Sequence, residues 1–248
     1  QAGLRAVHLA RAGFAGPLTV FEGAHGMFKA FAPSKAPDFT RLTEGLGTRW
    51  VIEGLAFKPY ACGTMTQPFV DCALKLAAGG VTAEDIVSIR CKVGEGTVHR
   101  LWEPLASKHR PPNGYAGKFS TPYCMAVAFL DGAAGLSQFT DARSQDPAVQ
   151  ALAARISYEV DPLDEYPHNF SGHLEATLKD GRTLSFRQPH MRGGAHEPLP
   201  ARELVAKFEA NLRFGGVDDG GIADLRAALG TLASGGAVDL AAARRSAR

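Results

Sequence analysis

The sequence predicts an α+β fold, in which a lid of mixed sheet and helix is inserted into a mainly helical domain. Apolar residues recur at helical spacing near both ends of the chain, whereas its middle combines alternating, strand-like runs with short helical runs. The chain has 248 residues, of which 45% are apolar, which suffices for one large domain or two small ones. We expect residues 1–52 to form part of the helical domain, residues 53–196 the α+β lid, and residues 197–248 a return to the helical domain, which is incomplete here.

Composition and charge exclude several classes of function. Lys and Arg total 27 against 25 Asp and Glu, and the net charge of +2 provides no electrostatic surface for nucleic acid. No run of about 18 apolar residues is present to cross a membrane. The four cysteines lack CxxC spacing and the histidines lack metal-ligand spacing, so we expect no metal site. We interpret the cysteines as reduced, mostly buried thiols of a cytoplasmic protein.

The N-terminal segment predicts helices separated by a glycine-rich turn. Residues 1–12 show helical apolar spacing up to Gly13, a residue type that often ends helices. No N-cap precedes this run and Gln1 is not an initiator Met, so we expect a piece of a longer chain. Asp38 is a good N-cap for a further helix over residues 39–46.

The middle segment contains strand signals. Residues 86–93 alternate between apolar and polar side chains, which predicts a half-buried strand with the odd-numbered residues, from Val87 onward, facing inward. Residues 172–178 and 182–188 flank a Lys-Asp-Gly sequence, which is typical of a β-hairpin. Between them, Asp146-Pro147 begins a helix whose apolar side extends to Ile156.

The C-terminal segment is predicted to be helical again. Apolar residues recur at helical spacing from Leu204 until Gly215-Gly216, after the helix-initiating Pro198 and Pro200. The alanine-rich tail continues in the same way and ends in a basic run, residues 244–248, which we interpret as a solvated terminus.

Residues 57–71 form the first candidate site. Pro68 suits the first turn of a helix capped by Thr66 or its neighbour, and the free N–H groups there attract a carboxylate. Lys58 is flanked by apolar and aromatic residues, and partial desolvation would lower its pKa toward the range of an acid–base catalyst. The alternative is a lysine extended along the surface before a turn. Thr64 and Thr66 of the same loop are candidate substrate-binding residues.

Residues 117–132 form the second candidate site. Ser120 is a natural N-cap and Gly132 a natural stop for a helix between them. Tyr123 in the first turn has a phenol that could pass a proton or hold a carboxylate, or it is a core tyrosine with a hydrogen-bonded hydroxyl. Ser120 and His25, which lies in a glycine-flanked turn, are further candidates for binding substrate. A loop histidine such as His25 can also simply cap a neighbour.

Short motifs follow one another along the chain in a distinctive order. They are Phe21-Glu22-Gly23 with Gly26, Phe57-Lys58-Pro59-Tyr60 with Pro68 and Asp71, Phe119-Ser120 with Tyr123 and Leu130-Asp131-Gly132, Gly172-His173, Asp180-Gly181-Arg182, and Lys207-Phe208. In these motifs the sequence resembles the MmgE/PrpD family, over nearly the whole chain up to about residue 216. Family members are nearly twice as long, and this chain resembles their C-terminal half.

The resemblance implies a helical domain with an α+β lid, an active site in the cleft between them, and a homodimer of the full-length protein. It also implies a lyase of the 2-methylcitrate dehydratase type, which acts on a small di- or tricarboxylate without a metal or organic cofactor and moves a proton next to a carboxylate. Lys58 matches an active-site lysine of the family, and Tyr123 matches its tyrosine on the facing helix. The other key groups of the family would precede Gln1.

One loop departs from the family pattern. Many relatives carry a histidine before the Pro68-type helix, where this sequence has Thr64 to Gln67, and the change removes a proton carrier. An epimerase or isomerase of a dicarboxylate on the same fold therefore remains an alternative. So does a decarboxylase, or a carboxylate-binding fragment without catalytic activity. As a fragment, the chain is expected to expose apolar faces and to aggregate or need a partner.

Overall fold

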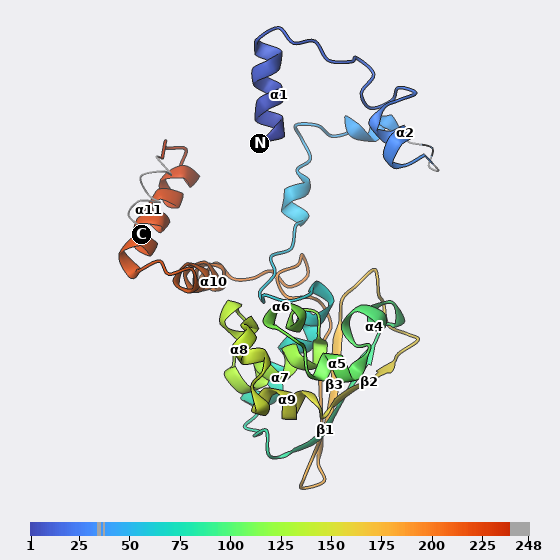
Figure 1. The fold of residues 1–248 in the computed structure, drawn as a ribbon, viewed down its shortest axis with the longest axis vertical. Coiled ribbons are helices and arrows are strands. Elements are labelled where there is room, and N and C mark those ends of the chain that lie inside the picture. Colours follow the sequence, from blue (N-terminus) through green and yellow to red (C-terminus); the bar gives the residue numbers. More distant parts are fainter. Residues whose placement is uncertain (34–35, 37, 239–248) are drawn as a thin grey trace. The chain divides into compact units, whose positions relative to one another are not determined.

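The structure, a computed structural model, describes residues 1–33, 36 and 38–238 and has the expected α+β fold (Figure 1). The chain divides into two compact units, Gln1–Glu53 and the part from Gly54 onward, and each is described by itself. The predicted division between residues 196 and 197 falls inside the second unit and stays a prediction. The predicted basic terminus, residues 244–248, lies outside the described residues.

The first unit consists of short helices joined by loops. They are α1 (Ala2–Arg11), α2 (Met27–Phe31), η1 (Phe39–Leu42) and η2 (Val51–Gly54), which reaches into the second unit. Gly13, with φ of +87°, follows α1 as predicted. The Asp38 carboxylate accepts the backbone N–H of Thr40 at 3.1 Å, but only one turn of 3₁₀ helix follows. The longer helix predicted there is wrong, because Gly45 and Gly47 have φ of +70° and +79° and turn the chain.

A four-stranded mixed sheet forms the centre of the second unit. Its order is β2 (Ile156–Val160), β1 (Ile86–Val93), β3 (Gly172–Leu178) and β4 (Thr183–Gln188). β1 runs parallel to β2 and antiparallel to β3, so that Cys91 lies opposite both Tyr158 and Leu174. β3 and β4 form the predicted hairpin, in which Gly181 has φ of +85°.

The inward face of β1 differs from the prediction at its start. A bulge between Ile86 and Ser88 shifts the register against β3. Ile86 therefore points into the core with 1% of its surface exposed, whereas Val87 is 52% exposed. The prediction that Val87 faces inward was wrong, and the predicted inward residues beyond the bulge are buried.

Two helices supply much of the core on one face of the sheet. α3 (Gln67–Ala78) packs against β3, β4 and α7 (Thr121–Asp131), and α7 packs against α9 (Pro147–Ala153). Cys91 on β1 reaches α7, where its Sγ lies 3.6 Å from Met125 Sδ. The opposite face of the sheet carries charged pairs such as Arg90–Glu159 and Lys92–Glu175. One buried and one polar face are typical of an α+β sheet with helices on one side.

The sequence signals for these helices are confirmed. Pro68 lies in the first turn of α3, and Gly80, just after its end, has φ of +78°. At the start of α7, Ser120 Oγ accepts the backbone N–H of Tyr123 at 3.1 Å, and Gly132 ends the helix with φ of +66°. Both helices are therefore fixed by local chemistry at their ends.

Shorter helices and two C-terminal helices complete the unit. They are η3 (Thr64–Thr66), α4 (Glu95–Leu101), α5 (Leu105–His109), α6 (Gly114–Gly117), η4 (Leu136–Phe139), α8 (Asp141–Ser144), α10 (Ala201–Phe214) and α11 (Asp219–Ala233). The helix that begins at Pro147 ends at Ala153, and Ile156 starts β2 opposite Ile89. The prediction that Ile156 lies on this helix was wrong, because Ile156 pairs with β1 and belongs to the sheet.

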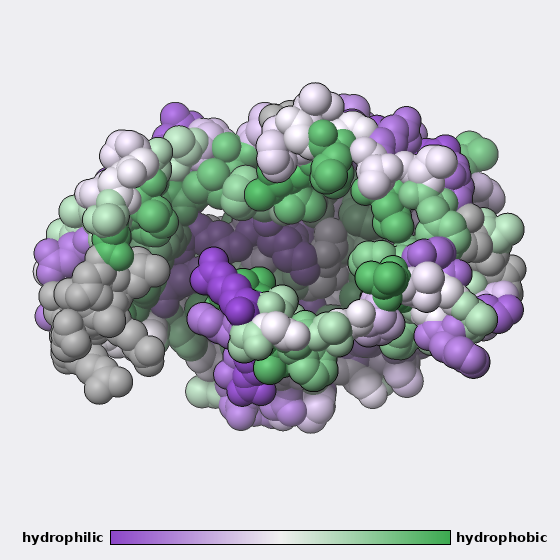
Figure 2. All heavy atoms as spheres, turned by 90° about the horizontal axis from the view of Figure 1, so that it is seen from above, coloured by the Kyte–Doolittle hydropathy of each residue, from purple (hydrophilic) through white to green (hydrophobic). Residues whose placement is uncertain are grey.

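Apolar side chains also lie on the surface. Leu4 and Val7 on α1 are 70% and 49% exposed, and Phe208 and Leu212 on α10 are half-buried. Figure 2 shows green apolar residues beside purple polar ones on the face that it views. Exposed apolar surface of this kind favours association. Among the described residues, no helix combines the length and apolar character needed to cross a membrane.

Candidate active site

A cavity of about 400 Å³ in the second unit is lined by the loop before α3, the residues before α7, and α10. Its lining residues are Lys58, Tyr60, Ala61, Cys62, Gly63, Lys118, Phe119, Leu136, Lys207 and Asn211. Three of these residues are lysines and none is acidic. A cavity with this charge attracts and holds anions.

The three lysines come from segments that are far apart in the sequence. Lys58 Nζ donates a hydrogen bond to the carbonyl oxygen of Cys62 at 3.4 Å, and Lys207 Nζ donates one to the carbonyl oxygen of Lys58. Lys118 Nζ lies 6.0 Å from the centre of the Tyr115 ring. Burial lowers the pKa of Lys207, and the neighbouring charge of Lys58 lowers it further. Lys207 therefore gives up its proton more readily than an exposed lysine.

Backbone hydrogen bonds fix the loop that carries Lys58. The N–H of Gly63 donates to the carbonyl oxygen of Lys118 at 2.8 Å, and the N–H of Ala61 donates to Ala134 at 2.9 Å. These bonds join the loop to the segments on either side of α7. The positions of Lys58 and Lys118 are therefore coupled through the main chain, and the cavity exists before any ligand binds.

The structure places Tyr123 in the core, against Gly117, which precedes the cavity residue Lys118. Its side chain is fully buried, and its hydroxyl donates to the carbonyl oxygen of Gln138 at 2.6 Å. The ring packs so closely on Gly117 that a Cβ there would lie 2.9 Å from it. Burial raises the pKa of Tyr123, which keeps the phenol protonated. Tyr123 does not line the cavity, and its catalytic role stays a prediction.

The predicted substrate-binding residues also lie outside the cavity lining. Thr66 is buried with its Oγ1 3.2 Å from Thr121 Oγ1, Ser120 is buried as the cap of α7, and Thr64 is half-buried in η3. Thr66 is the N-cap residue of α3 but makes no side-chain cap bond. His25 is exposed and belongs to the first unit. Their roles in binding stay predictions, whereas Lys58 alone among the predicted site residues lines the cavity.

The predicted site residues did not include Lys118, Lys207 or Tyr60, which line the cavity. Lys118 directly precedes the predicted Phe119-Ser120 helix start, so its place near that helix could have been inferred. Lys207 lies on α10; it was named in the family motif Lys207-Phe208 without a role, and no local pattern connects it with Lys58. Tyr60 was named in the family motif that contains Lys58 but was given no role, although its hydroxyl donates to Asp71 Oδ1 at 2.5 Å.

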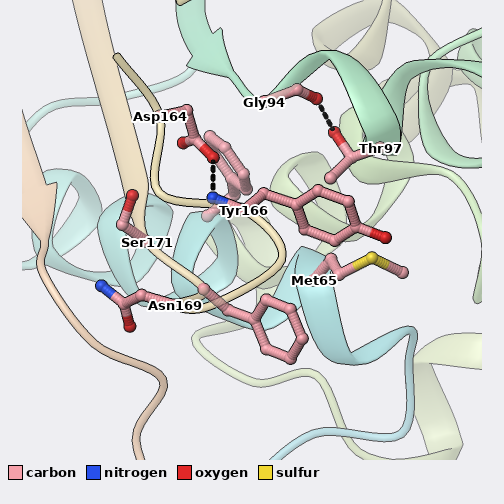
Figure 3. A pocket seen from close by; sticks show the side chains of 9 residues that line it. Met65, Gly94, Thr97, Asp164, Tyr166, Asn169 and Ser171 are labelled. Carbon is pink, nitrogen blue, oxygen red and sulfur yellow. Dashed lines mark hydrogen bonds between the residues drawn. The ribbon is translucent and has the colours of Figure 1, made fainter.

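A second cavity, beside Met65 of η3, is too small for an organic acid. Its volume is about 10 Å³, which holds about one water molecule. Figure 3 shows hydrogen bonds between some of its lining residues: the N–H of Tyr166 donates to Asp164 at 2.9 Å, and Thr97 Oγ1 donates to Gly94 at 2.8 Å. In the part of the chain that the structure describes, no cluster of His, Cys, Asp and Glu is placed to hold a metal ion.

The chain is similar in sequence to proteins of known family. The MmgE/PrpD C-terminal domain matches residues 60–227. Cis-aconitate decarboxylase of Mus musculus is 24% identical over 215 residues, which are 84% of this chain and 43% of that protein. The decarboxylase of Aspergillus terreus is 25% identical over 218 residues, with 81% and 43% covered. The 2-methylcitrate dehydratase of Cupriavidus necator is 28% identical over 179 residues, with 66% and 36% covered.

The chain thus spans less than half the length of these relatives. The family match covers the loop after Lys58, both helices beside the cavity, the sheet, and α10 with Lys207. Because it extends over more than half of the sequence, this chain belongs to the MmgE/PrpD family.

Proposed function

We propose that the lysine-lined cavity binds a small di- or tricarboxylate as part of a lyase active site. The observation that carries this proposal is the convergence of Lys58, Lys118 and Lys207 on a cavity of about 400 Å³, whose lining, as far as the structure describes it, contains no acidic side chain. Each ammonium group can donate a charge-assisted hydrogen bond to a carboxylate. The relatives are named as enzymes of cis-aconitate and 2-methylcitrate, and this supports a substrate with several carboxylates.

The reaction we propose is the removal of water, as in a 2-methylcitrate dehydratase. Dehydration and decarboxylation both place negative charge on a carbon next to a carboxylate, and fixed cations stabilise that charge. Lys58 would hold a substrate carboxylate. Lys207, whose pKa is lowered, would take part in moving the proton. The buried Tyr123 would act only after its hydroxyl leaves Gln138.

The wider setting is also part of the proposal. We infer chemistry without a metal or organic cofactor, a cytoplasmic location and a homodimer of the full-length protein. The four cysteines are free and buried, which fits a reducing compartment. A decarboxylase or an epimerase on the same fold is the alternative, and an assay that separates release of water, release of carbon dioxide and change of optical rotation distinguishes the three.

A binding measurement tests the site in the 248-residue chain. We expect isothermal titration to detect citrate binding, and Lys58→Gln or Lys118→Gln to weaken the affinity about ten- to a hundredfold, because a hydrogen bond to a charged group contributes ~1.5–3 kcal/mol. Lys92→Gln is the matched control, since Lys92 pairs with Glu175 on the polar face of the sheet. No binding by the wild-type chain, or equal losses from all three variants, would refute the proposed site.

The carboxylate-binding role without catalysis is the second candidate. It is favoured by one observation, the hydrogen bond that turns the Tyr123 hydroxyl toward Gln138. A chain that binds citrate with the expected lysine dependence, but releases no water, carbon dioxide or epimer from any citrate-like acid, would support this reading.

A further inference from the structure

A cluster of charged and hydroxyl groups is connected to the lysine-lined cavity through Tyr60. The Tyr60 hydroxyl donates to Asp71 Oδ1 at 2.5 Å, and Arg192 Nη1 lies 3.4 Å from both of these oxygens. Arg192 Nη2 donates to Glu203 Oε2 at 2.5 Å. We call Tyr60, Asp71, Arg192 and Glu203 the Arg192 clasp. None of the sequence motifs singled out Arg192.

The clasp joins three elements of the second unit. Asp71 lies on α3, Arg192 follows β4, and Glu203 lies in the first turn of α10. The backbone holds Arg192 in place, because the N–H of Phe57 donates to the carbonyl oxygen of Gly193 at 2.8 Å. Arg192 is therefore tied to the residue that precedes Lys58.

Polar contacts hold α10 against the segments that carry Arg192 and Lys58. Every residue of α10 is at least partly exposed, so the helix contributes little to the core. Two of its side chains form hydrogen bonds with these segments: Glu203 accepts one from Arg192, and Lys207 donates one to the carbonyl oxygen of Lys58. Glu203 and Lys207 are four residues apart and lie on one face of the helix. A contact that fixes Glu203 therefore also fixes Lys207.

Asp71 makes Arg192 hard to replace. The Asp71 side chain is only 3% exposed, and its Oδ2 has no hydrogen-bond partner among the residues that the structure describes. Removing the guanidinium would leave this buried carboxylate without its cation, which is costly. The planar guanidinium can also contact Asp71 and Glu203 at once, which a lysine ammonium on its single stem does poorly.

We propose that Arg192 is a positioning residue, which holds α10 so that the Lys207 ammonium stays at the cavity. The inference rests on the proposed function, in that it assigns how one of the three carboxylate-binding cations is placed. Arg192 does not line the cavity, so we expect it to act on a ligand indirectly, through Lys207.

Hydrogen exchange tests the positioning directly, without a ligand. In the full chain, Glu203→Gln removes the negative charge from the α10 side of the clasp, which weakens its hydrogen bond with Arg192, and leaves Arg192 to compensate Asp71. We expect amide exchange in residues 201–214 to rise at least about tenfold, with the sheet unchanged. Arg213→Gln is the matched control on the same helix, since Arg213 contacts Glu209 and Asp219 instead. Unchanged α10 exchange in Glu203→Gln would overturn the inference.

A double-mutant cycle with citrate tests the route through Lys207. We expect Glu203→Gln and Lys207→Gln each to weaken the affinity for citrate about tenfold. The double variant should bind citrate no more weakly than Lys207→Gln alone. Arg192→Lys should retain only part of the wild-type affinity for citrate. Additive losses would mean that Glu203 acts independently of Lys207, and the inference would be wrong. If the wild-type chain binds no citrate, the proposed function fails, and α10 exchange alone decides on the clasp.

Discussion

Replacing Gly193 with alanine should destabilise the protein more than the same change at Gly181. Both glycines have left-handed backbone, with φ of +87° and +85°. At Gly181, in the β3–β4 turn, a Cβ would meet nothing within 4 Å. At Gly193 it would lie 1.9 Å from the carbonyl oxygen of Phe57, so the backbone must move.

The cost of the left-handed backbone can be separated from the cost of the contact with Phe57. Left-handed alanine costs ~1–2 kcal/mol, and the stiffer unfolded chain returns ~0.4–1 kcal/mol, so Gly181→Ala should lower the free energy of unfolding by about 1 kcal/mol. Gly193→Ala carries the same cost and also breaks the hydrogen bond from the Phe57 N–H, which contributes ~0.5–1.5 kcal/mol. We therefore expect a loss of about 2 kcal/mol or more.

Urea denaturation of the two variants measures this difference. Gly193→Ala should also weaken the affinity for citrate, because Phe57 precedes Lys58 and a shift of Phe57 would move Lys58 too. Equal losses of stability in the two variants would show that the Phe57 contact relaxes without cost, and would refute the reasoning.

Three further results are expected. Burial raises the pKa of the Asp71 carboxyl above its ordinary 3.8, so the folded state keeps the carboxyl protonated to higher pH than the unfolded state does. The free energy of unfolding should therefore fall as pH rises through the raised pKa. Urea denaturation at a series of pH values should show a flatter pH profile for Asp71→Asn than for the wild type. Because the pKa of Lys207 is lowered, citrate affinity measured by calorimetry should fall on the alkaline side before ordinary lysines titrate, and Lys207→Arg should extend binding to higher pH. Tyr123→Phe should lower the free energy of unfolding by about 1 kcal/mol through the lost bond to Gln138, with citrate affinity unchanged; a large loss of affinity would instead show that the phenol reaches the ligand.

Elements whose ends are set by local chemistry could be predicted from the sequence. Pro68 at the start of α3, Ser120 and Gly132 at the ends of α7, and the Asp180-Gly181 turn all act on neighbours within a few residues. Their caps and dihedral preferences need no partner elsewhere in the chain. The α+β class followed from the order of these elements.

Features that depend on distant partners could not be predicted. Val87 turned outward because the bulge in β1 is defined against β3, which comes some eighty residues later in the chain, and Ile156 joined β2 because it pairs with Ile89. Periodicity within one segment carries no information about either pairing.

The same limit applies to the candidate site. Lys58 could be singled out from its neighbours and from the family resemblance. Its meeting with Lys118 and Lys207 depends on how three separate segments pack. The direction of the Tyr123 hydroxyl depends on the carbonyl group of Gln138, which only the folded chain brings within reach.

The strand order has a consequence for when the second unit can fold during synthesis. β1 lies between β2 and β3, and both neighbours leave the ribosome long after it does. Until then β1 offers two unsatisfied edges, the feature that makes nascent chains dependent on chaperones. A ribosome-stalled chain should thus keep β1 sensitive to protease until residue 178 has emerged.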